Sequence, residues 1–193
     1  MGRVQGKVAF VTGAARGQGR SHAIRLAEEG ADIIAVDRCE DFATVGYPMA
    51  APEELEETAQ YVEKTGQRVV TAQVDVSDAA KLKHAVDEGV SELGRLDIVV
   101  TSAGIAGMKG SADMASWVDV MNTNLIGTLN AIHVALPHLG EGASIIATGS
   151  TAALMDVSKN DNPGTDPGGA AYLHSKRLLS QYVHNIAVLQ FVG

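Results

Sequence analysis

The chain of 193 residues has one cysteine, few aromatic residues and no long apolar run. Cys39 has no second cysteine to pair with, so an internal disulfide is excluded and a cytoplasmic location is favoured. No apolar run approaches the roughly 20 residues that span a bilayer, which predicts that the chain has no membrane segment. Residues 1–6 lead directly into the first apolar run, and we therefore expect no signal peptide before the fold.

Clusters of basic residues are also lacking. The chain has 15 Lys and Arg against 23 Asp and Glu, a net charge of −8, which argues against a nucleic-acid surface because phosphate binding needs clustered positive charge. The 6 histidines are scattered and no Cys/His cluster has metal-ligand spacing, so no metal site is predicted. With 46% apolar and 20% charged residues, the chain is predicted to be a soluble domain with a substantial core.

Short β-branched runs alternate with longer stretches of helical periodicity along the chain. They predict strands over residues 7–12, 31–37, 68–74, 96–101 and 144–149, helices over 17–29, 52–65, 77–93, 113–136 and 170–189, and loops over 38–51 and 155–169. Ser77 is the predicted N-cap of the third helix. This alternation predicts an α/β fold, a single Rossmann-like domain over residues 1–193 with a doubly wound parallel sheet.

A glycine-rich turn, Thr12-Gly13-Ala14-Ala15-Arg16-Gly17-Gln18-Gly19, separates the first predicted strand from the first helix. Glycine permits positive φ and close approach of a ligand to the main chain, and a helix start offers free N–H groups to a pyrophosphate. A tight structural turn is the alternative, but the strand before and the helix after favour a dinucleotide site. The expected cofactor contacts in this turn are Gly13, Arg16, Gly17, Gln18 and Gly19.

The second predicted strand ends in an acidic residue followed by a basic one. Asp37 can accept hydrogen bonds from the ribose hydroxyls of NAD and would repel the 2′-phosphate of NADP. The alternative is a turn-forming role. Arg38 could favour NADP, although an arginine that points to solvent is the simpler interpretation. The sequence therefore predicts NAD as the cofactor.

Further cofactor contacts are expected where the third and fourth predicted strands end, since ligands of open α/β sheets bind at the carboxyl ends of the strands. These residues are Asp75, Val76, Ser102, Ala103 and Gly104. Asp75 could bind the amino edge of adenine, or it could simply open the loop before the third helix.

Tyr172 precedes Lys176 by about one helical turn, so the two side chains share a helix face. A phenol is a poor base at neutral pH, but a neighbouring ammonium and the positive nicotinamide stabilise the phenolate. Tyr172 could then take the proton of an alcohol, and Ser150, at the end of the fifth predicted strand, could hydrogen-bond the substrate oxygen. A surface pair on a helix is the alternative. With the glycine turn upstream, the pattern predicts nicotinamide-dependent interconversion of alcohol and ketone.

These segments resemble the short-chain dehydrogenase/reductase family across essentially the whole chain. The matching segments are Thr12–Gly19, Asp75-Val76, Ala103-Gly104, Asn124-Leu125-x-Gly127, Ser150 and Tyr172-x-x-x-Lys176. The resemblance implies that Asn124 interrupts the long helix and holds a water that relays protons to Lys176. It also implies that Tyr172 and Lys176 contact the cofactor and that Lys176 grips the nicotinamide ribose. Without the resemblance, Asn124 would be interpreted as a polar helix residue.

Residues 11–36 and the loop 37–54, with Tyr47-Pro48-Met49-Ala50, resemble a narrower group, the mycofactocin-coupled, carveol-dehydrogenase-like enzymes of actinobacteria. That resemblance implies oxidation of bulky hydrophobic secondary alcohols such as terpenoids. It also implies a loop close to NAD, NAD that does not exchange freely, and mycofactocin as electron acceptor.

The chain departs from the family pattern at three places. Ser102 stands where the family usually has the asparagine that supports the sheet near the site. The gap between Ser150 and Tyr172 is wider than usual, which an outward bulge of the loop 155–169 would accommodate. The sequence ends soon after the helix of Lys176, without the last two strands of the family. We therefore expect a truncated product or a fragment, with the fifth strand at a sheet edge and a substrate pocket that lacks a wall.

Three functional hypotheses remain. The first is an NAD-dependent secondary-alcohol dehydrogenase that works through Asn124, Ser150, Tyr172 and Lys176. The second is a folded but inert nucleotide-binding or scaffold remnant. The third is another carbonyl reductase of the same family, such as a ketoacyl reductase, against which Asp37 argues because many of these enzymes use NADPH. The resemblance also implies a homo-oligomer, a dimer or tetramer, formed through the last two helices.

Overall fold

The computed structural model describes residues 2–107, 114–154 and 167–189. Within these ranges the strands form a single parallel sheet in the order β3-β2-β1-β4-β5. The strands are β1 (Val8–Thr12), β2 (Asp32–Asp37), β3 (Val69–Gln73), β4 (Leu96–Thr101) and β5 (Leu139–Ala147). The sheet confirms the predicted α/β class, and β1 lies at its centre.

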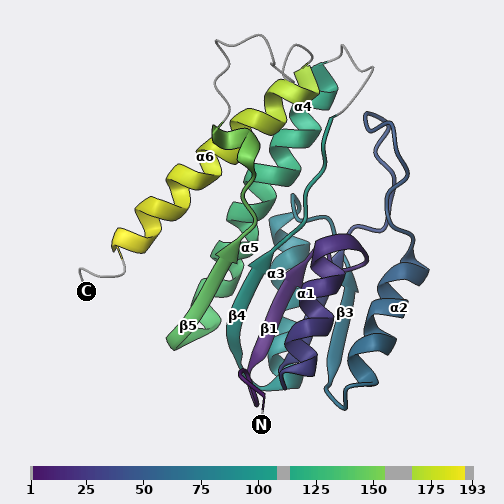
Figure 1. Ribbon diagram of the computed structural model, residues 1–193, viewed down its shortest axis with the longest axis vertical. Coiled ribbons are helices and arrows are strands. Elements are labelled where there is room, and N and C mark those ends of the chain that lie inside the picture. The colour runs from purple at the N-terminus through teal and green to yellow at the C-terminus, as the bar shows by residue number, and fades with distance from the viewer. Residues whose placement is uncertain (1, 108–113, 155–166, 190–193) are drawn as a thin grey trace.

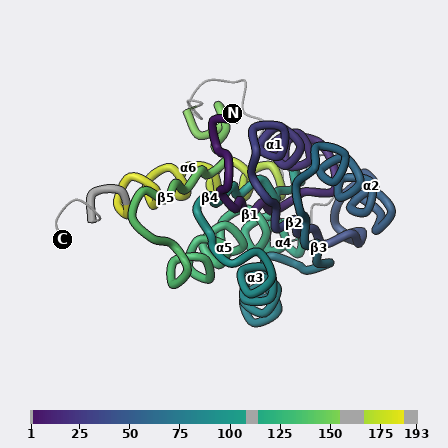
Figure 2. The backbone as a smooth tube through the Cα atoms, turned by 90° about the horizontal axis from the view of Figure 1, so that it is seen from below, coloured from purple at the N-terminus to yellow at the C-terminus, as the bar shows by residue number. Residues whose placement is uncertain are grey.

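Helices cover both faces of this sheet (Figure 1). The helices are α1 (Gly17–Glu28), α2 (Pro52–Glu63), α3 (Ala79–Leu93), α4 (Met114–Met121), α5 (Gly127–Ala135) and α6 (Pro167–Leu189), with short turns η1 (Asn122–Ile126), η2 (Leu136–His138) and η3 (Thr151–Leu154). Figure 2 shows α1 on one side of the sheet and α3 and α5 on the other. None of the described helices combines the length and apolarity needed to cross a membrane.

The core consists of two layers, one on each face of the sheet. Side chains alternate along β1, so Ala9 and Val11 pack against α1 and α2, whereas Val8 and Phe10 pack against α3 and α5. Because both faces are covered, the central strands are continuously apolar, as is usual for parallel sheets. Full burial of each large side chain, such as Phe10, contributes about 1.5–3 kcal/mol relative to exposure. This buried centre fixes the strand ends from which the polar residues project.

The structure corrects several predicted boundaries. Asp78, rather than Ser77, caps α3: its Oδ1 accepts a hydrogen bond from the N–H of Lys81 at 3.1 Å. The reason is that Ser77 lies in a turn, where its own N–H donates to Asp75 Oδ1 at 2.8 Å. The single helix predicted over 113–136 is α4 and α5 separated by the π-helical turn η1.

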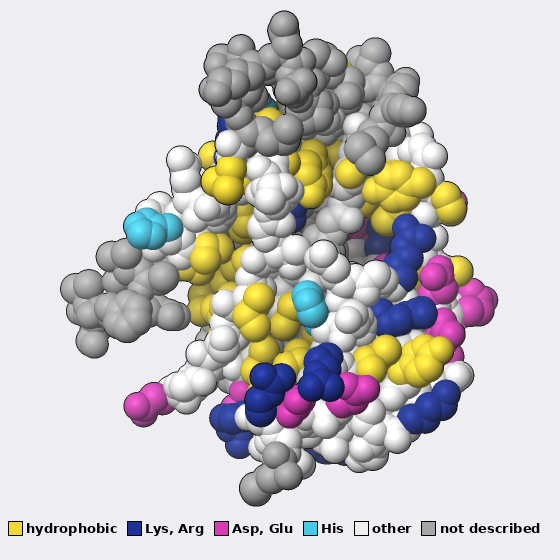
Figure 3. Space-filling model, in the orientation of Figure 1, with side chains coloured by type: hydrophobic (Ala, Val, Ile, Leu, Met, Phe, Trp, Pro, Cys, Tyr) yellow, Lys and Arg dark blue, Asp and Glu magenta, His cyan; other side chains and the backbone are white. Residues whose placement is uncertain are grey.

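Two further elements begin earlier than the sequence predicted. β5 starts at Leu139 and α6 at Pro167. The expected loop over 155–169 lies outside the described residues for 155–166. β5 forms one edge of the described sheet, as predicted. Apolar side chains are exposed on β5 and on α6: Ile146 on β5 is 47% exposed, and Leu178 on α6 is 45% exposed. Figure 3 shows apolar side chains at the surface on this side of the molecule.

A buried carboxylate fastens the amino ends of β1 and β4. Asp97 accepts hydrogen bonds from Lys7 Nζ and from the N–H of Val8, both at 3.0 Å. It also accepts a pair of hydrogen bonds from the Arg95 guanidinium, at 2.6 and 2.7 Å. Burial alone would raise the pKa of Asp97, but these donors outweigh it and hold the pKa below its ordinary value of 3.8. The charged form of Asp97 therefore stabilises the folded state.

We predict that Asp97→Asn lowers the free energy of unfolding by about 2 kcal/mol at pH 7, because charged hydrogen bonds are lost while the shape is kept. Since the pKa of Asp97 is lower in the folded than in the unfolded state, its contribution is present above about pH 4 and is lost as the pH falls through the folded value. Urea denaturation of both proteins at pH 7 and near pH 3 measures the difference, which should shrink at the lower pH. Replacement of the exposed Glu63 by Gln is the control. An equal difference at both pH values would contradict the prediction.

Candidate active site

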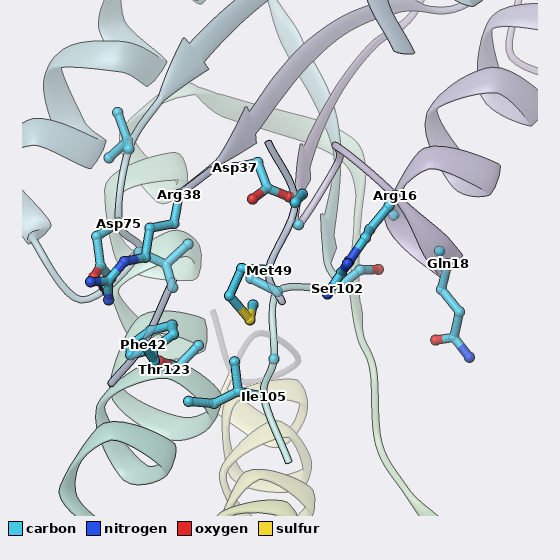
Figure 4. Close-up of a pocket in the computed structure, with 18 of the residues that line it drawn as sticks. Arg16, Gln18, Asp37, Arg38, Phe42, Met49, Asp75, Ser102, Ile105 and Thr123 are labelled. Atoms are coloured by element: carbon cyan, nitrogen blue, oxygen red, sulfur yellow. Dashed lines mark hydrogen bonds and ion pairs between the residues drawn. The ribbon is translucent and has the colours of Figure 1, made fainter. Parts of the chain in front are cut away.

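A pocket of about 260 Å³ lies at the carboxyl ends of the strands, beside the amino end of α1 (Figure 4). Apart from Tyr172 and Lys176, every residue predicted to contact a cofactor lines it. These residues are Gly13, Arg16, Gly17, Gln18, Gly19, Asp37, Arg38, Asp75, Val76, Ser102, Ala103 and Gly104. Phe42, Tyr47 and Met49, from the loop after β2, also line the pocket and were not predicted as site residues.

The glycine turn forms a cradle whose shape depends on glycine, because a side chain at two of its positions would collide with the backbone. A Cβ on Gly13 would lie 2.8 Å from the Cα of Ala103, and one on Gly19 would lie 2.0 Å from the carbonyl oxygen of Gly13. Gly17 has a φ of +59° and faces open space. Helix α1 has no side-chain cap and no acidic residue in its first turn, so its first N–H groups are available to an anion. The cradle therefore fits a pyrophosphate.

Asp37 is held in a fixed orientation at the end of β2. Its Oδ2 accepts a hydrogen bond from the N–H of Ala15 at 3.0 Å, and its Oδ1 accepts one from the N–H of Cys39 at 3.1 Å. The two bonds hold the carboxylate at the pocket wall, where the hydroxyls of a ribose could bind. Burial, and then the charge of Asp37, raise the pKa of the Cys39 thiol to about 12, so Cys39 is not a reactive thiolate.

Arg38 does not extend into solvent, and that simpler interpretation of the sequence was wrong. Its Nη1 lies 2.9 Å from Asp75 Oδ2, and its guanidinium carbon lies 3.7 Å from the centroid of the Phe42 ring. The side chain is thus held between a carboxylate and an aromatic face. Figure 4 shows it directed away from Asp37 and toward Asp75.

The loop after β2 is tied by hydrogen bonds to three segments around the pocket. The Arg16 guanidinium donates to the carbonyl of Pro48 at 2.7 Å, and the hydroxyl of Tyr47 accepts from the N–H of Ala106 at 2.9 Å. Thr44 Oγ1 donates to Asp119 Oδ2, on α4, at 2.5 Å. The loop therefore spans from the glycine turn to the segment after β4 and to α4.

Lys176 lies buried on α6, with only 6% of its surface exposed. Its Nζ donates to the carbonyl oxygen of Thr148 at 2.7 Å and lies 6.0 Å from the centroid of the Tyr172 ring. Burial lowers the pKa of Lys176 from its ordinary value. The phenol and the cation therefore share one face of α6, as the spacing predicted.

Tyr172 connects this helix with the nucleotide pocket through an apolar cluster. The buried members are Ile105, Val120 and Ala171, and Phe42, Val45, Met49, Trp117, Met121 and Tyr172 pack against them. Ile105, Phe42 and Met49 also line the pocket. The structure thus brings the predicted catalytic tyrosine and the predicted cofactor pocket together around shared side chains.

Ser150 follows the end of β5, two residues after Thr148. Its Oγ accepts a hydrogen bond from the N–H of Ala152 at 3.2 Å, within its own turn. The next residues form η3, which contacts α6 where Arg177 Nε donates to the carbonyl of Ala153 at 3.0 Å. Ser150 therefore lies beside the helix that carries the tyrosine and lysine, although its described contact is local.

Asn124 is fully buried in the π-helical turn. Its Oδ1 accepts from the N–H of Ile105 and its Nδ2 donates to the carbonyl of the same residue, both at 2.8 Å. Asn124 therefore interrupts the long helix, as the resemblance implied, and fixes the segment after β4. π-Helical turns within α-helices occur frequently at functional sites.

Ser102 stands at the centre of a hydroxyl cluster that the sequence did not reveal. Its N–H donates to Thr12 Oγ1 at 3.1 Å, and its own Oγ lies 3.3 Å from Thr148 Oγ1 and 3.1 Å from His22 Nδ1. Serine at this position thus still braces the sheet end. Hydroxyl residues at three neighbouring strand ends are the signal that could have predicted it.

The part of the chain that the structure describes has no group of three or more His, Cys, Asp or Glu residues arranged to hold a metal ion.

Known proteins resemble this chain in sequence and in fold. A family model described as short chain dehydrogenase matches residues 7–188. The (-)-trans-carveol dehydrogenase of Rhodococcus erythropolis is 43% identical over 97% of this chain and 70% of its own. The solved carveol dehydrogenase from Mycobacterium avium in complex with NAD is 42% identical, with a TM-score of 0.86, over 97% of this chain and 67% of its own.

A short chain dehydrogenase from Mycobacterium paratuberculosis, solved bound to NAD, is 40% identical, with a TM-score of 0.87. It is matched over 97% of this chain and 68% of its own length. The chain thus spans about two thirds of the length of these relatives, and nearly all of it is matched. From the matched family model and from these relatives, the chain belongs to the short-chain dehydrogenase family.

Proposed function

We propose that the chain binds NAD and oxidises a hydrophobic secondary alcohol to a ketone. The observation that carries the proposal is the convergence of three features: the glycine cradle, the oriented Asp37 carboxylate, and the Tyr172–Lys176 pair packed beside them. A dinucleotide cradle without the tyrosine would indicate binding alone. The tyrosine without the cradle would be a surface residue.

The residues of the pocket fit NAD. The first turn of α1 would take the pyrophosphate, and Asp37 would accept hydrogen bonds from the adenosine ribose. The resemblance implies that Lys176 would reach the second ribose. Solved relatives that are 42% and 40% identical hold NAD, which supports the same cofactor here. Bound NAD would supply the acceptor for the two electrons removed from the alcohol carbon.

Tyr172 would take the hydroxyl proton of the alcohol as general base. Lys176 is already desolvated, so its positive charge acts on the phenol through a medium that screens it less than water. That charge would stabilise the negative oxygen of Tyr172 as the proton is transferred. Ser150 would orient the substrate oxygen, and Asn124 would support the segment after β4. The resemblance implies that Asn124 also holds a water, to which the proton taken by Tyr172 would pass by way of Lys176.

The substrate class follows from the apolar side of the site and from the relatives. Ile105, Trp117 and Met121 lie in the cluster that packs around Tyr172, which suits a hydrocarbon ring better than a charged chain. One relative acts on carveol, and a cyclohexanol dehydrogenase from Rhodococcus is 34% identical. Reduction of a ketoacyl substrate is the second candidate, and Asp37 argues against its usual NADPH cofactor.

The loop after β2 supports slow exchange of the cofactor. Hydrogen bonds of Arg16, Thr44 and Tyr47 tie this loop to the glycine turn, to α4 and to the segment after β4, and these ties would slow the release of a bound dinucleotide. Retained NAD must be reoxidised in place by an external electron acceptor, and mycofactocin is the acceptor that the resemblance implies. Apolar side chains exposed on α4, η1 and α6 (Val118, Ile126 and Leu178) support self-association as a dimer or tetramer.

Tyr172→Phe should retain NAD but reduce turnover at least about 100-fold, because only the proton-accepting hydroxyl is removed. NAD released by denaturation is measured by absorbance, and turnover is measured with carveol and an artificial electron acceptor. Wild-type protein with NAD and turnover supports the dehydrogenase.

The other outcomes of this experiment separate the hypotheses. NAD without turnover in the wild type would support an inert nucleotide-binding remnant. Absence of both would contradict the proposed function altogether. Turnover that survives Tyr172→Phe would remove the phenol from the mechanism.

Tyr47→Phe should raise the dissociation rate of NAD roughly three- to tenfold, because the N–H of Ala106 loses its acceptor and the loop opens more readily. The rate is measured by displacement of bound NAD with an excess of labelled NAD. Tyr61→Phe is the matched control, since Tyr61 also uses its hydroxyl in a hydrogen bond, to Glu57 on the exposed side of α2. Equal rates for the two variants would refute a retaining role for the loop.

A further inference from the structure

We propose that Asp75 sets the preference for NAD over NADP by holding Arg38 away from the position of a 2′-phosphate. The inference rests on the proposed binding of NAD and assigns a selectivity role to a residue that follows β3 and contacts Arg38. Asp37 and Arg38 are adjacent in sequence at the end of β2, yet their charges have opposite consequences for a phosphate on the adenosine ribose.

Arg38 is the residue that could defeat the selectivity of Asp37. A guanidinium binds phosphate through paired hydrogen bonds, and an arginine close to the adenosine ribose is a usual means of accepting NADP. Arg38 follows Asp37 directly and lines the same pocket, so a free guanidinium there would offset the repulsion from the carboxylate. Discrimination against NADP therefore requires that Arg38 be engaged elsewhere.

Contacts with Asp75 and Phe42 hold Arg38 in another direction. Its Nη1 lies 2.9 Å from Asp75 Oδ2, and both side chains are 29% exposed, so the pair is shielded from water more than a surface pair. The ring of Phe42 lies 3.7 Å from the guanidinium carbon and holds its plane. In Figure 4 the guanidinium lies between Asp75 and Phe42, while Asp37 points in another direction.

Asp75 is itself fixed, which makes it an effective anchor. Its Oδ1 accepts the N–H of Ser77 at 2.8 Å, which leaves Oδ2 directed at Arg38. One atom of Arg38 lacks a hydrogen bond: Nε is buried without a hydrogen-bond partner among the described residues, and it lies 4.0 Å from Glu40 Oε2. If Asp75 no longer held the guanidinium, this unpaired N–H would gain a hydrogen bond by turning toward a phosphate.

The test uses ADP-ribose and 2′-phospho-ADP-ribose, whose binding needs neither substrate nor turnover. Affinities are measured by isothermal titration for wild type, Asp75→Asn, Arg38→Met and the double variant. Asparagine keeps an acceptor for the N–H of Ser77 and removes only the charge that holds Arg38. Asp75→Asn should bind 2′-phospho-ADP-ribose at least about tenfold more tightly than wild type, because a charged hydrogen bond becomes available. Arg38→Met in the same chain should abolish that gain.

The four proteins and two ligands together distinguish failure of the inference from failure of the proposed function. Wild-type binding of ADP-ribose with no gain in Asp75→Asn would overturn the inference and leave the proposed function standing. A gain that persists in the double variant would also overturn it, because loss of negative charge alone would then explain the effect. Failure of the wild type to bind ADP-ribose would overturn both. Should Asp75→Asn fail to fold, Asp75→Ser, whose hydroxyl can accept from Ser77, takes its place with the same expected gain.

Discussion

The hydroxyl of Thr12 joins the two halves of the site. Its Oγ1 accepts the N–H groups of Ser102 and Ala103, both at 3.1 Å, and so binds the end of β1 to the end of β4. The glycine turn continues from one of these ends, and the segment that carries Ile105 continues from the other. A parallel sheet places all its carboxyl ends along one edge, but these bonds fix the distance between neighbouring ends. The nucleotide cradle and the apolar cluster around Tyr172 therefore keep a constant separation.

Some charged groups of the site are paired with an opposite charge, and others bond only to main-chain groups. Arg38 is paired with Asp75, and Lys176 donates to a main-chain carbonyl, whereas the Asp37 carboxylate is held by two neutral N–H groups. Neither Asp37 nor Lys176 is opposed by a countercharge among these contacts, so both groups remain available to ligands. In a partly dry pocket each such charge has a greater effect than in water.

The fold and the nucleotide residues were predictable because they depend on short, local patterns. Glycines between a strand and a helix, and residues at strand ends, identified 12 of the 19 residues that line the pocket. Contacts between distant segments were not predictable. The direction of Arg38 depends on Phe42 and Asp75, and the hydrogen bonding of Ser102 depends on His22. Asp75 is far from Arg38 in the sequence, as His22 is from Ser102, and neither group of residues shares a periodic pattern. Asn124 illustrates the limit of what local sequence patterns predict, since only the resemblance indicated that it interrupts a helix.

The two halves of the site rest on parts of the sheet that differ in stability. The nucleotide cradle follows β1, whose residues are all buried between two layers of helices, whereas Lys176 depends on Thr148, just beyond β5 at the sheet edge. Residues along β5 alternate between partly buried and exposed, so fewer apolar contacts oppose its local opening. Opening of β5 would release the Thr148 carbonyl and the lysine before it disturbed the glycine turn. Nucleotide binding should therefore be the more robust property of this chain, and the catalytic geometry the one that fails first under heat or denaturant.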